Sequence, residues 1–209
     1  MSTSPTAALA APPHGSADPR VKKSGCKLDH SPDILTATRG AEGLNLHGEG
    51  QVDFNGSRFC AYHNGCMRCG LINCQFYLSN INLGDGSLCV VPGSHKSNYP
   101  CPQDIKLYRA DQQLVYQIPL KAGVLVIFNE ATMHGTLPWR GKQERRIMLY
   151  RYTPKYLYYA GGHYQILMSD WVSELTPARQ VVLEPPYIYH RPLLEDDGAI
   201  LVNPRREGK

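Results

Sequence analysis

Residues 71–78 read LINCQFYL, and the alternation in this stretch decides the fold class that the sequence predicts. Successive side chains of a β-strand point to opposite faces, so the stretch predicts a strand with one apolar and one polar face. The apolar face comprises Ile72, Cys74, Phe76 and Leu78. The polar face comprises Asn73, Gln75, Tyr77 and Ser79, and such a face lies either in solvent or in the cavity of a β-barrel.

Further strand patterns follow at short intervals along the chain. The turn Gly84-Asp85-Gly86 leads to a strand over residues 87–91, which Pro92-Gly93 ends. Additional strands are predicted over residues 114–120, 124–128 (fully buried) and 147–152. Helical patterns are confined to residues 169–175 and 176–183, where Thr176 and Pro177 suit the N-cap and first helical positions. The pattern predicts an all-β sandwich or barrel with short C-terminal helices.

Composition excludes several classes of protein. Of the 209 residues, 42% are hydrophobic and 19% are charged, as in an ordinary globular protein. No apolar run approaches the ~20 residues that cross a bilayer, and a net charge of +4 is too small to favour a nucleic-acid binder. We therefore expect neither membrane nor nucleic acid as a partner, and the sequence leaves the oligomeric state open.

The ends and the cysteines suggest a cytoplasmic protein. Residues 1–25 are predicted to be a disordered lead without a secretory signal, residues 26–200 one domain, and residues 201–209 a flexible tail. The chain has seven cysteines, an odd number that favours reduced thiols over a disulfide framework.

His47-Gly48-Glu49 is the first candidate for a metal site. Residues i and i+2 of a strand project to the same face, so His47 and Glu49 can reach one ion. His134 follows the predicted strand 124–128 and offers a second imidazole. Two histidines and one carboxylate on one side of an octahedron are the ligands of non-haem Fe(II) oxygenases. An isolated His-x-Glu is more often a solvated turn.

Arg145 is a candidate anion-binding residue, eleven positions after His134. An arginine on the inner face of a barrel needs an anionic partner, and its planar fork suits a carboxylate such as that of 2-oxoglutarate. The alternative is an arginine at the edge of a strand, paired with Glu144 or with solvent.

Four runs of the sequence resemble the phytanoyl-CoA dioxygenase family over roughly residues 27–190. They are LNLHG (44–48), CGLIN (69–73), GDGSLCVVPGSHK (84–96) and HGTLPW (134–139), the last followed by Arg145. The resemblance implies a double-stranded β-helix, a jelly-roll or cupin-like fold. It also implies a cytoplasmic Fe(II)- and 2-oxoglutarate-dependent dioxygenase that hydroxylates a small organic substrate with O₂.

The same resemblance implies roles for individual residues. The iron ligands would be His47, Glu49 and His134, with no further catalytic residue. The 2-oxoglutarate site would comprise Arg145, Thr136 and Gln75, with Arg146 as the alternative to Arg145 if the register shifts by one. His95, in the PGSHK run, would shape a loop and not bind iron.

Two other readings stay open at the level of sequence. The chain could be a catalytically inactive or truncated cupin-like binding domain. It could also be an interaction module stabilised by zinc, since Cys66-x-x-Cys69 has the spacing of a zinc knuckle and Cys60 and Cys74 lie nearby.

Overall fold

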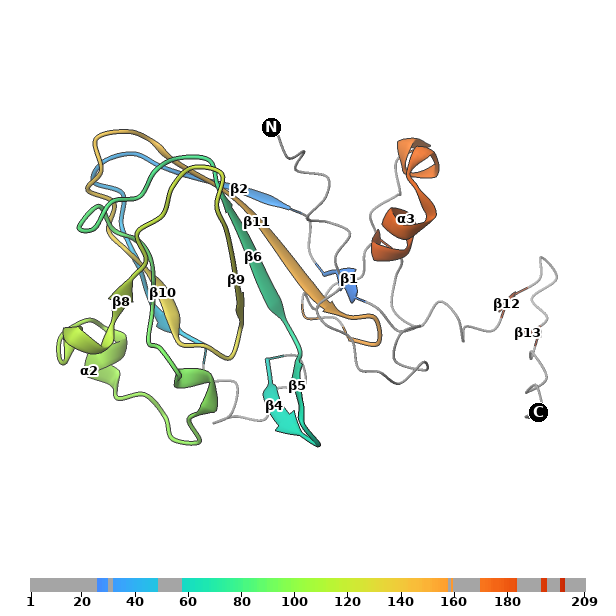
Figure 1. Ribbon diagram of the computed structural model, residues 1–209, viewed down its shortest axis with the longest axis horizontal. Helices are drawn as coiled ribbons and strands as arrows, with labels where there is room; N and C mark the ends of the chain where they lie inside the picture. The colour runs from blue at the N-terminus through green and yellow to red at the C-terminus, as the bar shows by residue number, and fades with distance from the viewer. Residues whose placement is uncertain are drawn as a thin grey trace.

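Two antiparallel β-sheets face each other in the computed structural model (Figure 1). The five-stranded sheet has the order β1-β11-β6-β9, with β2 also paired to β11. Its strands are β1 (Cys26–Leu28), β2 (Asp33–Ala37), β6 (Ile72–Tyr77), β9 (Leu125–Asn129) and β11 (Arg145–Pro154). The four-stranded sheet has the order β3-β10-β7-β8. Its strands are β3 (Leu44–His47), β7 (Ser87–Val90), β8 (Tyr116–Gln117) and β10 (His134–Leu137).

The structure describes residues 26–29, 32–48, 58–157, 159, 170–183, 193–194 and 200–201. The predicted lead over residues 1–25 and the tail beyond residue 201 lie outside these ranges. Two small hairpins complete the described strands: β4 (Cys60–His63) with β5 (Cys66–Cys69), and β12 (Leu193–Leu194) with β13 (Ile200–Leu201).

The chain crosses between the two large sheets as it runs from β6 to β11. Strands β6, β9 and β11 belong to one sheet, and β7, β8 and β10 belong to the other. Repeated crossing between two facing antiparallel sheets is the jelly-roll pattern. The predicted all-β class with few helices is therefore confirmed.

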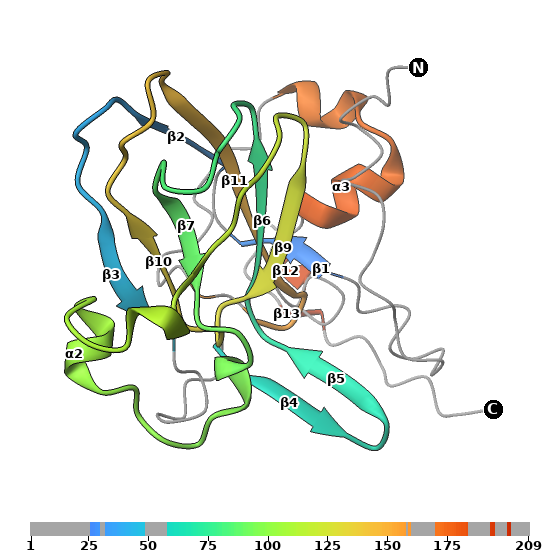
Figure 2. The same cartoon turned by 60° about the vertical axis from the view of Figure 1, so that its left-hand side comes forward.

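The helices are short and lie outside the two sheets. The 3₁₀ turn η2 (Ser94–Lys96), helix α2 (Gln103–Lys106) and the 3₁₀ turn η3 (Gln112–Leu114) connect β7 to β8 and cover one face of the four-stranded sheet (Figure 2). The predicted C-terminal helices correspond to η4 (Asp170–Glu174) and α3 (Pro177–Leu183). None of the helices in the described ranges is long and apolar enough to cross a membrane.

The main core fills the space between the sheets. Its buried residues are Ala37, Tyr77, Ile81, Leu88, Trp139 and Ile147, drawn from both sheets and their connections. A second cluster, Leu46, Cys89, Ile105 and Met133, lies under α2 on the outer face of the four-stranded sheet. Side chains alternate where the chain enters β10: Met133, just before the strand, packs into this outer cluster, whereas His134 faces the interior.

The polar face of β6 lies inside the protein. Asn73, Gln75 and Tyr77 are at most 9% exposed, whereas Cys74 and Phe76 are only half-buried on the opposite face. Of the two positions that the sequence allowed for this face, the structure has the interior one. Buried polar side chains require hydrogen-bond partners, so these three residues are candidates for a site between the sheets.

Two strand predictions need correction. The stretch 124–128 was expected to be fully buried, but Ile127 in β9 is 61% exposed. Ile127 pairs with Cys74 of β6, and Cys74 and Phe76 are only half-buried on the same face, so this face of the five-stranded sheet meets solvent. The stretch 114–120 forms only the two-residue β8, preceded by η3, and Pro119 shortly after it has no main-chain N–H to extend the ladder.

Gly86 is required at a close approach between the two connections that meet beside Trp139. Its φ is +96°, and a Cβ built there would lie 2.1 Å from the carbonyl oxygen of Pro138. Gly84 has a similar φ of +87°, but a Cβ there would contact nothing within 4 Å. An alanine at Gly84 would therefore meet backbone strain alone, whereas an alanine at Gly86 would meet backbone strain and steric overlap.

Substituting each glycine by alanine tests this packing. We expect Gly84→Ala to lower the free energy of unfolding by about 1 kcal/mol, the cost of a left-handed alanine. Gly86→Ala should lower it by about 3 kcal/mol or more, because overlap with the backbone is added to that cost. Urea unfolding measures both, and equal losses would contradict the close approach.

Candidate metal centre

His47 and His134 come together because their strands pair. His47 ends β3, His134 begins β10, and the two residues are direct partners in the antiparallel register. Directly opposed residues project to the same face, and the two ring centroids are 4.2 Å apart. The two histidines are 87 positions apart in the sequence, and strand pairing brings them together.

Both imidazoles are oriented by main-chain carbonyl groups. The Nδ1 atom of His47 lies 2.9 Å from the carbonyl oxygen of Asn45, and that of His134 lies 2.7 Å from the carbonyl oxygen of Thr132. A carbonyl oxygen only accepts, so each Nδ1 carries the proton and donates it. Each Nε2 then has a free lone pair, which is the form that binds a metal ion.

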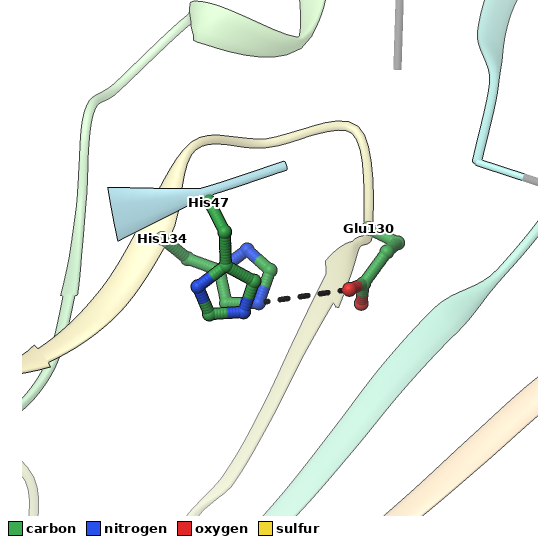
Figure 3. Close-up of side chains that lie close together, drawn as sticks. All are labelled: His47, Glu130 and His134. Carbon is green, nitrogen blue, oxygen red and sulfur yellow. Dashed lines mark ion pairs between the residues drawn. The ribbon is translucent and has the colours of Figure 1, made fainter. Parts of the chain in front are cut away.

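Glu130 supplies a carboxylate beside the two rings (Figure 3). It follows β9 directly, and its Oε1 atom lies 4.0 Å from Nε2 of His134. Its Oε2 atom accepts a hydrogen bond from the side-chain amide of Asn73. One ligand atom each from His47, Glu130 and His134 lie within 4.8 Å of one another.

Burial adjusts the charge state of this group. His134 and Glu130 are buried, whereas His47 is the most exposed of the three residues. Burial lowers the pKa of His134 below its ordinary value, an effect that the nearby Glu130 only partly offsets. The neutral ring, which can bind a metal, is therefore the favoured form near neutral pH.

Gly48 allows the end of β3 to approach the loop that carries Glu130. Its φ is +131°, and a Cβ built there would lie 2.5 Å from the carbonyl oxygen of Thr132. That same carbonyl orients His134. The glycine of the His-Gly-Glu run thus has a steric reason to be glycine.

The donor set fits a divalent transition metal that keeps open positions. Two imidazole nitrogens and one carboxylate oxygen are the three ligands of the non-haem Fe(II) facial triad. His47, His134 and a carboxylate would hold such an ion, which would supply open positions for further ligands. Asn73 and the two carbonyl groups provide the outer hydrogen bonds that such ligands usually have.

Arg145 is a buried cation in the same space between the sheets. It begins β11, is 9% exposed, and lies over Trp139 with 6.0 Å between its Cζ atom and the ring centroid. Among the residues that the structure describes, its Nε atom has no hydrogen-bond partner. Burial lowers the pKa of Arg145, which means that an anionic partner would stabilise its charged form.

Arg146 has a different environment from its neighbour. Its side chain is 61% exposed and forms two hydrogen bonds, at 3.0 and 3.2 Å, with the carboxylate of Glu144. The surface pairing considered for Arg145 therefore belongs to Arg146. Of the two arginines, only Arg145 is placed to bind an anion between the sheets.

The other predicted 2-oxoglutarate residues lie on β6 and β10. Gln75 is buried in β6, and its Oε1 atom accepts a hydrogen bond of 2.7 Å from the hydroxyl of Tyr77. Thr136 lies two residues after His134 on β10, about 6.6 Å further along the strand. The predicted ligand Glu49 lies outside the described residues.

Three supporting residues were not foreseen from the sequence. Glu130 and Asn73 carry no motif of their own, although Asn73 belonged to the polar face of the first predicted strand. Ser94, in the PGSHK run, accepts a hydrogen bond of 2.8 Å from the main-chain N–H of Met133 and donates one to the carbonyl of Val91. His95 beside it is not in the metal-ligating group.

The four cysteines of the zinc hypothesis do not converge on one point. Cys66 and Cys69 project from opposite faces of the β4–β5 hairpin, and Cys74 lies on the outer face of β6. Within the described ranges, His47, Glu130 and His134 form the one group of three potential metal ligands, and it contains no cysteine. The structure therefore does not support a zinc module.

Comparison with known proteins finds similarity to one enzyme family over part of the chain. The family model for phytanoyl-CoA dioxygenase (PhyH) matches residues 53–147, which include Glu130 and His134. The crystal structure of HygX from Streptomyces hygroscopicus with nickel and 2-oxoglutarate bound superposes with a TM-score of 0.56 at 27% identity. Part of this chain therefore resembles the PhyH family. No curated protein sequence matches it.

The structural match to HygX is partial. It covers 64% of this chain and 58% of the HygX chain. The HygX structure with iron bound gives a TM-score of 0.54 at 26% identity, covering 64% and 60% of the two chains. AviO1 from Streptomyces viridochromogenes Tue57 gives a TM-score of 0.42 at 18% identity, covering 58% and 48%. The family-model match and the HygX structures confirm the predicted resemblance to PhyH proteins and the jelly-roll fold.

Metal binding by single variants tests the PhyH-like site. We expect the protein to bind one Co(II) ion, and His47→Ala or His134→Ala to weaken binding by at least about 100-fold, because loss of a ligand should exceed the loss of an outer hydrogen bond. His95→Ala is the matched control and should bind like the wild type. Calorimetric titration measures all four proteins, and equal affinities would refute the site.

The same titration distinguishes the two candidate carboxylates. Glu130→Gln keeps the hydrogen-bonding shape but removes the charge, and we expect it to weaken Co(II) binding. Glu49→Gln is the companion variant. A loss confined to Glu49→Gln would assign the third ligand to Glu49 and leave Glu130 as its neighbour.

Proposed function

We propose that the protein is an Fe(II)- and 2-oxoglutarate-dependent oxygenase acting on a small organic substrate. The observation that carries the proposal is the His47–His134 pair, with both Nε2 atoms available and a carboxylate in reach. Iron and 2-oxoglutarate are bound in crystal structures of HygX. They are also the cofactors that the sequence predicts.

In this proposal, His47 and His134 hold the iron together with one carboxylate, from Glu130 or Glu49. The main-chain carbonyl groups of Asn45 and Thr132 keep each Nδ1–H engaged, so the rings need no reorganisation when the ion binds. The amide of Asn73 restrains Glu130 in the same way. This preorganisation keeps both Nε2 atoms directed for metal binding.

Arg145 provides the second anchor of the proposed cofactor site. Its guanidinium can form a bidentate pair with the distal carboxylate of 2-oxoglutarate, in a space where little water competes. Thr136 and Gln75 offer hydroxyl and amide groups between this anchor and the histidines. A buried cation whose Nε has no described partner thereby gains an anion.

The oxidising chemistry belongs to the cofactors: iron and 2-oxoglutarate together consume O₂, convert 2-oxoglutarate to succinate and CO₂, and oxidise a C–H bond of the substrate. The protein supplies position and exclusion of water. Phe128 packs edge-to-face on His134 with 4.8 Å between ring centroids, which shields one side of the centre. We propose the outcome to be hydroxylation.

The substrate and the compartment are further parts of the proposal. HygX has been crystallised with hygromycin B, so this compound is the first to try. No disulfide joins the seven cysteines, all of which the structure describes, and this supports a cytoplasmic location.

Conversion of 2-oxoglutarate to succinate tests the proposal, with Arg145→Gln and Arg146→Gln as a matched pair. We expect iron-dependent succinate formation by the wild type. Arg145→Gln should raise the KM for 2-oxoglutarate roughly 10- to 100-fold, because hydrogen bonds between charged groups contribute about 1.5–3 kcal/mol. Arg146→Gln, which alters a surface pair, should leave the KM unchanged.

Two results would argue against the proposed function. A folded protein that binds iron but forms no succinate, with or without hygromycin B, would favour the inactive binding domain. A rise in KM with Arg146→Gln instead of Arg145→Gln would overturn the assignment of the anchor.

A further inference from the structure

The β4–β5 hairpin holds two cysteines face to face. Cys60 in β4 and Cys69 in β5 are direct cross-strand partners, and Asn64 and Gly65, both with positive φ, form the two-residue turn between the strands. Figure 2 shows the hairpin extending beyond the end of the large sheet, joined to β6. This pair lies outside the proposed metal and 2-oxoglutarate sites.

The register places the pair at a position suited to a cross-link. The main-chain N–H of Gly70 donates to the carbonyl of Phe59, so the adjacent pair 59/70 is the hydrogen-bonded one. Cys60 and Cys69 therefore form a non-hydrogen-bonded pair, in which Cα atoms approach to about 4.5 Å. That separation lies within the range that disulfides span.

The two sulfur atoms already touch. Sγ of Cys69 lies 3.2 Å from Sγ of Cys60, so side-chain rotations that bring the two atoms about 1 Å closer would reach bonding distance. Cys60 is 6% exposed and Cys69 is partly exposed. Cys66 is exposed and projects from the other face, opposite His63, so the hairpin offers it no thiol partner.

We propose that Cys60 and Cys69 form a reversible disulfide in the presence of a small-molecule disulfide such as oxidised glutathione. The sulfur of Cys69 loses its proton and attacks the glutathione disulfide, whose S–S bond breaks and releases one glutathione thiol. The sulfur of Cys60 then loses its proton, attacks Cys69 and releases the second glutathione. Two cysteine sulfurs are oxidised and one glutathione disulfide is reduced.

The cross-link would fix the chain where it enters β6. Cys69 is followed by Gly70 and Leu71, and the carbonyl of Leu71 accepts a hydrogen bond of 2.9 Å from the main-chain N–H of Glu130. Asn73, two residues further on, holds the carboxylate of Glu130. The disulfide would therefore stabilise the hairpin and the strand that supports the metal centre.

Burial makes this a slow reaction at neutral pH. It raises the pKa of Cys69 to about 12, because the thiolate is poorly solvated and its neighbour Cys60 adds no positive charge. Incubation in a glutathione redox buffer for hours, and not a brief exposure, is the appropriate test.

The full-length protein is incubated with excess oxidised glutathione, alkylated, and analysed by intact mass and peptide mapping. We expect the number of alkylated thiols to fall from seven to five, and a peptide pair joined through Cys60 and Cys69 to appear. Cys66→Ser should retain the cross-link and Cys60→Ala should abolish it. Dithiothreitol should restore all seven thiols.

Two results would overturn the proposal. One is a cross-link through Cys66 or any other cysteine; the other is seven alkylated thiols after oxidation of the folded wild type. The wild-type measurement stands without any variant, so poor folding of Cys60→Ala would leave the test intact. Iron binding and succinate formation are separate readouts, so failure here would not bear on the proposed oxygenase.

Discussion

The antiparallel pairing of β3 with β10 is the contact on which the proposed chemistry depends. It places His47 opposite His134, and the main-chain carbonyl groups beside each residue orient the rings. Gly48 keeps the end of β3 close to the loop that carries Glu130. A shift of one residue in this register would turn one imidazole to the other face of the sheet and remove the metal centre.

The space between the sheets contains buried polar and charged side chains that need partners. Most polar groups buried there have partners, such as Asn73 with Glu130 and Tyr77 with Gln75. Arg145 is a cation whose Nε has no partner within the described ranges. Burial of an unpaired charge is costly, so a site of this kind is most stable when an anion is bound. The distal carboxylate of 2-oxoglutarate satisfies that requirement in the proposed function.

Local patterns in the sequence were sufficient for much of this account. Alternation in residues 71–78 predicted β6 and its polar face. The choice between Arg145 and Arg146, which the sequence left open, needed the structure, in which Arg145 is buried and Arg146 is exposed. Glu130 was missed because its approach to the histidines depends on how β9 and β10 pack, which no local pattern records. The predicted burial of β9 was wrong for a similar reason: exposure of Ile127 depends on what packs over that face of the sheet, which no local pattern records. The role of Glu49 stays a prediction.

Anaerobic titration of the protein with Fe(II) and then 2-oxoglutarate tests the central claim most directly. The account predicts that a visible charge-transfer band, typical of a 2-oxo acid chelating a facial-triad iron, appears with the wild type. It should be absent in His134→Ala at the same concentrations. A folded wild type that binds Fe(II) and 2-oxoglutarate without this band, or a band that persists in His134→Ala, would contradict the paired histidines as the iron site.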